Sequence, residues 1–303
     1  RVRYNSCYCI FLLAKVEENR TIIANDDNMM DQLVKVANIE GEAEDDFDDE
    51  ISVDGSLNQR FANLGSPSGI RQQGAPETNE ESDRGCRLSV MKVFLAISKV
   101  KDGAFAMVRH TDLMNLLVKI SGTMTAEENI LCAAVFTNLT RNVENMDALR
   151  HVPHLLVTVK RGMNSKNEEC RKCACLTLQN LSCDKQFRRK IGETEYNLPA
   201  LASHSLKSHT PENQLAAFNT IRNLAIEPAN MPVILGSSGI AASLMNEAIK
   251  KDDGINQYLA ADSLAALSQW LDSVADTAME RNEIEIKDRT LASLNVTTWN
   301  QWE

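Results

Sequence analysis

The chain has 303 residues, of which 43% are hydrophobic, 24% charged and only 5% aromatic, and its formal net charge is −10. This length allows two domains or one extended repeat array. Few aromatic residues, with 13 Gly and 7 Pro, argue against an all-β sandwich or barrel, which needs frequent turns and β-favouring residues. No stretch approaches the roughly 20 apolar residues of a membrane span, so we expect no membrane partner.

Charge is distributed unevenly along the chain. Residues 40–54 contain nine acidic residues and no Lys or Arg, which leaves the rest of the chain nearly neutral. Residues 141–190 are net positive, with eleven Lys and Arg against five Asp and Glu, and residues 250–303 are net negative. This pattern lacks the strongly basic footprint of a nucleic-acid-binding protein, so we expect no nucleic-acid partner.

Five short strings recur at nearly constant spacing. They are VFLAIS (93–98), AVFTNLT (134–140), TLQNLS (177–182), TIRNLA (220–225) and SLAALS (263–268). Their common apolar positions, called the anchors, are 42, 42, 43 and 43 residues apart: Ile97, Leu139, Leu181, Leu224 and Leu267. The residues three and seven positions before each anchor are also apolar, which places all three positions on one face of a helix. The chain therefore predicts tandem repeats of 42–43 residues.

Each repeat is predicted to contain three helices. The residues fourteen positions before the anchors are all N-cap types: Asp83, Thr125, Asn167, Thr210 and Asp253. Thr125 with Glu128 forms a capping box, and Pro211 suits a first helical position. Between these anchor helices lie further apolar segments, and breaks at 151–154 and 236–239 predict a turn between a short and a longer helix. Such a unit has the length of an armadillo or HEAT repeat.

The repeats resemble those of the armadillo family. The strings NLT, NLS and NLA resemble the family's third-helix ending, and HVPHLL (151–156) resembles the start of its second helix. The resemblance covers about residues 85–270. It implies an all-α fold, a right-handed α-α superhelix of armadillo or HEAT type with about five to six repeats.

In chain order, we expect a partial N-terminal repeat at 1–39, an acidic disordered insertion at 40–84, four to five armadillo repeats at 85–272 and C-terminal capping helices at 273–303. Leu13 lies two repeat lengths before Ile97 and should anchor an earlier third helix. The insertion lacks periodic apolar residues that could offset its ordering entropy. Two helices, 273–280 and 284–302, should close the array, with Trp299 and Trp302 covering its last apolar face. A truncated last repeat is the alternative.

Three asparagines form the candidate binding site. Asn138, Asn180 and Asn223 each precede an anchor by one residue, on a helix face turned away from the core. In armadillo proteins that this chain resembles, third helices line a concave groove and such asparagines hydrogen-bond the backbone of an extended peptide. An amide suits this role because it offers a donor and an acceptor. The alternative is that each Asn caps carbonyls of its own helix.

Six residues are expected to flank this groove: Thr137, Arg141, Lys172, Gln179, Asn219 and Arg222. The basic ones resemble catenin-type modules that bind acidic extended ligands. Importin-α-like members place Trp four residues before the ladder asparagine, where this chain has Ala134, Leu176 and Asn219. Without aromatic side chains, the aliphatic stems of a basic localisation signal have nothing to pack on, so a nuclear-transport adaptor is disfavoured.

No pattern supports catalysis, a cofactor or a metal site. Cys170, Cys173, Cys175 and Cys183 have spacing that invites a zinc site. The repeat register, however, places Cys173 and Cys175 at buried apolar positions, where a free Cys behaves as a small hydrophobe. Eight cysteines in the chain favour a reducing compartment, so we expect a cytoplasmic or nuclear location, or both.

The sequence therefore predicts a non-catalytic protein–protein interaction module that holds an extended segment of another protein, with an acidic segment favoured. We also hypothesise that the acidic residues 42–54 fold back as an intramolecular ligand of the basic middle repeats. The alternative from another class is a structural scaffold subunit of a large cytoskeletal or ciliary assembly.

Overall fold

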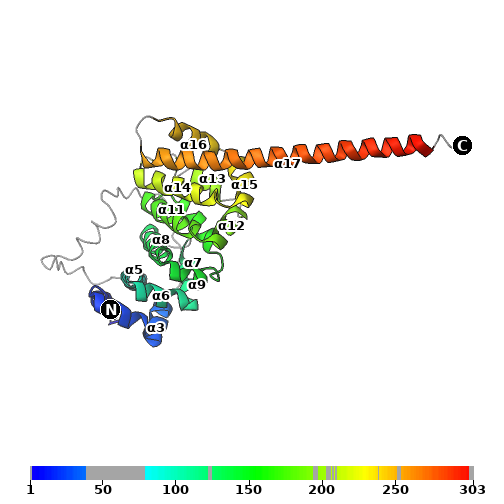
Figure 1. Ribbon diagram of the computed structural model, residues 1–303. Coiled ribbons are helices and arrows are strands. Elements are labelled where there is room, and N and C mark those ends of the chain that lie inside the picture. Colours follow the sequence, from blue (N-terminus) through cyan, green and yellow to red (C-terminus); the bar gives the residue numbers. More distant parts are fainter. Residues whose placement is uncertain are drawn as a thin grey trace.

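The period of 42–43 residues corresponds to one three-helix unit of the solenoid. The computed structural model describes residues 2–38, 79–121, 125–193, 197–202, 206, 208, 210–237, 239–250 and 254–299. Within these ranges every regular element is a helix and no strand occurs. The units follow one another along the stack, from α1 at one end to α17 at the other (Figure 1). The predicted all-α solenoid is confirmed.

The third helices pack side by side in chain order. They are α1 (Val2–Ala14), α5 (Asn79–Ser98), α8 (Ala126–Arg141), α11 (Glu168–Ser182), α14 (Pro211–Leu224) and α17 (Ile255–Trp299). Pairs of shorter helices connect them: α2 (Glu17–Ala24) and α3 (Asp27–Ala37), α6 (Lys101–Arg109) and α7 (Thr111–Ile120), α9 (Met146–Leu149) and α10 (Leu155–Met163), α12 (Lys185–Glu193) and α13 (Asn197–Ala200), and α15 (Met231–Gly236) and α16 (Ile240–Ala248). Single 3₁₀ turns, Val143–Asn145 and Pro228–Asn230, precede α9 and α15.

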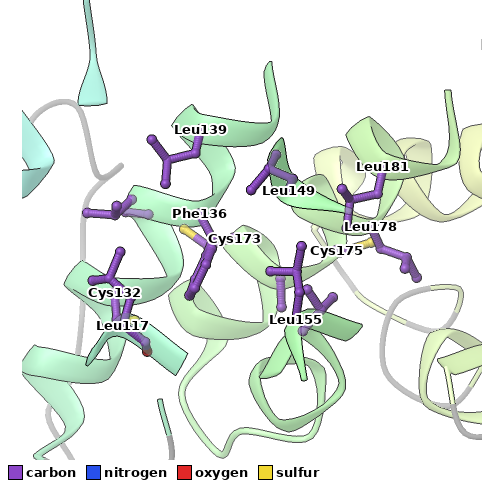
Figure 2. Close-up of a cluster of buried hydrophobic side chains, with 14 of the residues drawn as sticks. Leu117, Cys132, Phe136, Leu139, Leu149, Leu155, Cys173, Cys175, Leu178 and Leu181 are labelled. Carbon is purple, nitrogen blue, oxygen red and sulfur yellow. Dashed lines mark hydrogen bonds between the residues drawn. The ribbon is translucent and has the colours of Figure 1, made fainter. Parts of the chain in front are cut away.

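The anchors form the centre of the core. All five are buried, and the first four are fully so. Figure 2 shows Phe136 and Leu139 of α8, with Leu149, Leu155, Leu178 and Leu181 from the next repeat, as one continuous apolar cluster. Burying each such side chain is worth about 1.5–3 kcal/mol. The spacing that defines the repeat is therefore also the spacing of its core.

The predicted helix starts are confirmed at three of the five positions, and the side chain caps the helix at two of these. Thr125 and Glu128 form the capping box, and the Asn167 side chain accepts from the Cys170 amide. Pro211 is the first residue of α14, but the hydroxyl of Thr210 donates to Glu168 on the neighbouring helix and does not cap its own. The Asp83 prediction is wrong, because α5 already begins at Asn79. Asp253 lies outside the described residues.

The predicted breaks inside the second apolar segments are present. Between α9 and α10, His154 adopts a left-handed backbone conformation with φ of 59°. Between α15 and α16, Gly239 does the same with φ of 87°. A residue with positive φ ends the right-handed helical path, so the chain can change direction between the short and the long helix.

Leu13 is not the anchor of the first third helix. Its side chain is 54% exposed, whereas Ala14 is fully buried and Cys7 lies seven residues before it in the core. One residue corresponds to a rotation of about 100° around a helix, so this shift moves Leu13 off the core face. Helices α2 and α3 follow within the predicted N-terminal partial repeat.

The C-terminal region differs from the two predicted capping helices. Helix α17 is continuous over 45 residues, and its second half projects beyond the solenoid (Figure 1). Residues 271–281 are all exposed and cover no apolar face. The physical reason is that this helix contains neither Gly nor Pro to interrupt it. The Trp299 side chain and Trp302 lie outside the described residues, as does most of the predicted acidic insertion, since residues 39–78 are not described.

Candidate functional site

The three ladder asparagines make the same contact on successive third helices. Each amide nitrogen donates to the hydroxyl that follows the anchor of the preceding third helix: Asn138 to Ser98 at 3.0 Å, Asn180 to Thr140 at 3.2 Å and Asn223 to Ser182 at 3.0 Å. We call these three amide–hydroxyl pairs the ladder, and the surface of α8, α11 and α14 that carries it the ladder face. The asparagines therefore have one common orientation. They bond to the preceding helix and not to carbonyls of their own.

Each acceptor hydroxyl also fixes which way its asparagine faces. The hydroxyls donate their single proton to a carbonyl of their own helix: Ser98 to Leu95, Thr140 to Phe136 and Ser182 to Gln179. A hydroxyl that has already donated can only accept, so the amide nitrogen must face it. The amide oxygen therefore points away from the contact between the two third helices.

The ladder asparagines offer a ligand fewer hydrogen-bonding groups than the sequence predicted. Asn180 donates a second time to the Thr137 carbonyl at 3.3 Å, and Asn223 to Cys183 Sγ at 3.6 Å. The donor side of these amides is thus engaged between repeats. All three asparagines are half-buried, and the oxygen is the group that remains for a ligand. The ladder face presents a row of acceptors, which suits backbone N–H groups.

The contact between α14 and α17 has no amide–hydroxyl pair, because both residues of the pair are replaced. Ala225 takes the place of the hydroxyl residue and Ala266 that of the asparagine. The joint between α14 and α17 carries instead an ion pair, with Arg222 Nε 2.7 Å from Asp262 Oδ2. At the other end Ala96 of α5 also replaces an asparagine.

Thr137 is not a flanking residue of the ladder face. Its side chain is buried, and Oγ1 lies within hydrogen-bond distance of the carbonyls of Ala133 and Cys173, at 3.0 and 2.9 Å, and of Thr177 Oγ1. It joins α8 to α11. It was mispredicted because it lies one residue, and therefore about 100°, from Asn138.

The remaining flanking residues differ in how available they are. Lys172, Gln179, Asn219 and Arg222 are half-buried and Arg141 is exposed. Arg222 is paired with Asp262, and Lys92 on α5 is 3.4 Å from Glu127. Lys172 and Arg141 form no ion pair with another described residue. Among the predicted flanking residues, the basic side chains without an ion-pair partner in the described part of the chain therefore lie on α8 and α11.

The hydroxyl partners Ser98, Thr140 and Ser182 were missed by sequence reasoning. A signal for them existed, because each immediately follows an anchor in the repeating strings. Their role needs the preceding repeat to lie alongside, about 40 residues away in the chain. A repeating pair of Asn before and Ser or Thr after the anchor is the pattern to look for.

Cys173 and Cys175 occupy core positions, as the repeat register predicted, whereas Cys183 is exposed. Cys173 and Cys175 are buried, and burial raises the pKa of the Cys173 thiol to about 12, which keeps it protonated at neutral pH. In the described part of the chain, no three His, Cys, Asp or Glu side chains come together as metal ligands would. The helices described there include none long and apolar enough to cross a membrane.

Comparison with known proteins identifies the fold and no closer relative. No family model and no curated protein match the chain. Three similar solved structures are informative. A designed armadillo repeat protein is 14% identical, covers 87% of this chain and 92% of its own with a TM-score of 0.62. A second designed armadillo repeat protein, in complex with the peptide (KR)4, is 15% identical, with coverages of 82% and 98% and a TM-score of 0.53. The armadillo repeats only protein from Plasmodium falciparum is 12% identical, with coverages of 84% and 97% and a TM-score of 0.52.

The chain has the armadillo-repeat fold. The resemblance stated from the sequence is confirmed at this level.

Proposed function

We propose that the protein is a non-catalytic interaction module whose ladder face binds an extended segment of another protein. The carrying observation is the common orientation of Asn138, Asn180 and Asn223, which turns three amide oxygens to the same side of successive helices. An extended peptide has free backbone N–H groups that need acceptors. A solenoid repeats one acceptor per unit, so it can follow such a peptide along its length.

The charge of the ladder face favours an acidic segment. Lys172 and Arg141 flank the ladder without an ion-pair partner among the described residues, and each would gain a partner from a bound carboxylate. The acidic residues 42–54 belong to the same proposal as an intramolecular competitor. Deletion of residues 40–78, which leaves α5 intact, should then increase affinity for acidic peptides. Unchanged affinity would remove the intramolecular part of the proposal.

The first experiment compares the double variant Asn180→Ala/Asn223→Ala with the wild type in peptide binding. Extended peptides of alternating Asp and Glu, and the basic peptide (KR)4, are titrated by fluorescence anisotropy at two salt concentrations. We expect at least a tenfold loss for the acidic peptide in the double variant, and weaker binding at higher salt. Asn115→Ala, at an exposed position of α7, is the matched control and should bind as the wild type does. Wild-type affinity in the double variant would refute the role of the ladder, and tighter binding of (KR)4 would refute the preference for acid.

Ser182→Ala tests the orientation of the amide without removing it. Asn223 would then lose the acceptor that holds its nitrogen, and its oxygen would no longer have a fixed direction. We expect a loss of about threefold to tenfold in peptide affinity with the fold intact by circular dichroism, in line with the loss of one hydrogen bond. Wild-type peptide affinity in Ser182→Ala would show that the hydrogen bond from Asn223 to the Ser182 hydroxyl does not contribute to peptide binding.

The scaffold alternative is supported by a different region. The exposed residues 271–281 of α17 project from the solenoid and offer a helix surface to an assembly. A variant truncated after Trp270 should keep peptide binding if the ladder face is the functional surface. Loss of assembly from that truncation, with wild-type assembly in Asn180→Ala/Asn223→Ala, would favour the scaffold. A cytoplasmic or nuclear location forms part of both proposals, since all eight cysteines are free thiols and a reducing compartment preserves them.

A further inference from the structure

A cavity of about 230 Å³ opens on another side of the same repeats. It lies between α8, α10 and α11, and Ala133, Phe136, Val159 and Ala174 supply much of its mainly apolar wall. Phe136 precedes Asn138 by two residues, a rotation of about 200° around α8. The cavity is therefore separate from the ladder face, and the proposed function does not use it.

One buried hydroxyl in the wall of this cavity has no hydrogen-bond partner among the described residues. Thr158 lines the cavity with only 4% of its surface exposed, and its Oγ1 makes no hydrogen bond within the described part of the chain. The neighbouring Thr177 also lines the cavity, but its hydroxyl donates to the Cys173 carbonyl at 2.8 Å. An unsatisfied buried hydroxyl costs free energy. A ligand that accepts a hydrogen bond from Thr158 would remove that cost.

The charged groups of the cavity all have one sign. Arg161 and Lys166 line it, and the described lining residues include no carboxylate. Arg161 lies three residues after Thr158, on the same face of α10. Within the described residues, its hydrogen bond is a long one, 3.4 Å from Nη1 to the Ser121 carbonyl. A carboxylate could therefore accept from the Thr158 hydroxyl and pair with Arg161 at the same time.

We propose that this cavity is a binding site for a small amphipathic carboxylate, with an apolar body of about eight carbon atoms against Phe136, Ala133 and Ala174 and its anionic group at Thr158, Arg161 and Lys166. The size is consistent with this class, because an apolar cavity of about 150 Å³ already accommodates benzene. The combination of an apolar body and a few polar groups that fix orientation is the usual design of a small-molecule site.

Isothermal titration of the full chain with octanoate tests the site, and 1-octanol and octylammonium separate charge from apolarity. We expect saturable binding of one octanoate with a Kd below about 1 mM, at least tenfold weaker binding of 1-octanol, and none of octylammonium. Octanoate that binds without saturation, or no more tightly than 1-octanol, would overturn the proposal.

Three variants locate the binding. Ala133→Leu should abolish it by filling the cavity, and Arg161→Gln/Lys166→Gln should reduce octanoate affinity to that of 1-octanol. Thr158→Val, which keeps the shape of the side chain, should weaken octanoate binding about threefold to tenfold and leave 1-octanol unaffected, even if Ala133→Leu proves unstable. Asn180→Ala/Asn223→Ala is the matched control and should bind octanoate as the wild type does, whatever it does to peptide binding. Wild-type octanoate affinity in both Thr158→Val and Arg161→Gln/Lys166→Gln would place the ligand elsewhere and refute the site.

Discussion

The contact between third helices α11 and α14 differs from the contact between α14 and α17. The first combines a buried apolar seam with the pair of Asn223 and Ser182. The second has alanines at both equivalent positions and relies on packing and on the ion pair of Arg222 with Asp262. Beyond Trp270, α17 has no joint among the described residues, and every residue from 271 to 281 is exposed.

This difference shows what a repeat contributes and what its neighbours contribute. A third helix in the middle of the stack contacts a third helix on each side, so one of these neighbours can orient its polar side chains. Helix α17 packs against α14 and α16, and at its contact with α14 the polar pair is absent. Solenoid stability is approximately a sum of such nearest-neighbour terms. Substitutions should therefore change the free energy of unfolding less and less from the middle of the stack toward the projecting half of α17.

The largest effect is expected from the core of the middle repeats. Leu181→Ala removes a fully buried anchor and should lower the free energy of unfolding by about 2–5 kcal/mol. Leu271→Ala, at a side chain that is 47% exposed on α17, should cost less than about 0.5 kcal/mol. Urea unfolding followed by circular dichroism measures both. Equal costs would show that the projecting part of α17 is packed against something in solution.

A smaller, pH-dependent effect on stability is expected at the contact between Arg150, just after α9, and Asp184, just before α12. Burial disfavours ionised Asp184, yet the Arg150 guanidinium, with Nη2 2.6 Å from Oδ2, and the amides at the start of α12 hold the pKa of that carboxyl below its ordinary value. Because the folded-state pKa is lowered, this stabilisation is present above the ordinary carboxyl pKa and is lost as pH falls through the folded pKa.

Asp184→Ala should therefore lower the free energy of unfolding by about 2 kcal/mol at pH 7, since it removes both a helix cap and an ion pair. Asp184→Asn retains a capping oxygen and should cost less. The difference between wild type and Asp184→Asn should decrease as pH is lowered from 5 to 2. A difference that stays constant over that range would exclude the ion pair as its source.

The smallest effect on the free energy of unfolding is expected from a single amide–hydroxyl pair of the ladder. A double-mutant cycle of Ser182→Ala and Asn223→Ala should give a coupling free energy of about 1 kcal/mol. Installing the missing rung as Ala225→Ser/Ala266→Asn should stabilise the α14–α17 joint by a similar or smaller amount, and each single change should not. Absence of coupling in the first cycle would mean that the ladder orients side chains without stabilising the stack.

The sequence alone determined the repeat and its core. The anchors, the small and medium apolar residues before them, the caps at Thr125 and Asn167 and the turns near His154 and Gly239 depend on local chemistry and on helical periodicity. The positions of the ladder asparagines could be predicted for the same reason, since one residue before an anchor defines a face. A shift of one residue was enough to misplace Leu13 and Thr137, because one residue is a rotation of about 100°.

The tertiary structure alone decided what those asparagines can do. Their orientation depends on hydroxyls about 40 residues away in the chain, and the chain cannot specify that contact until two repeats lie side by side. The same holds for the hydroxyl of Thr158, which has no partner among the described residues, because its cavity is formed by three helices from two repeats. It holds as well for α17, where the absence of helix breakers fixes its continuity but only its neighbours show which residues are packed and which are exposed.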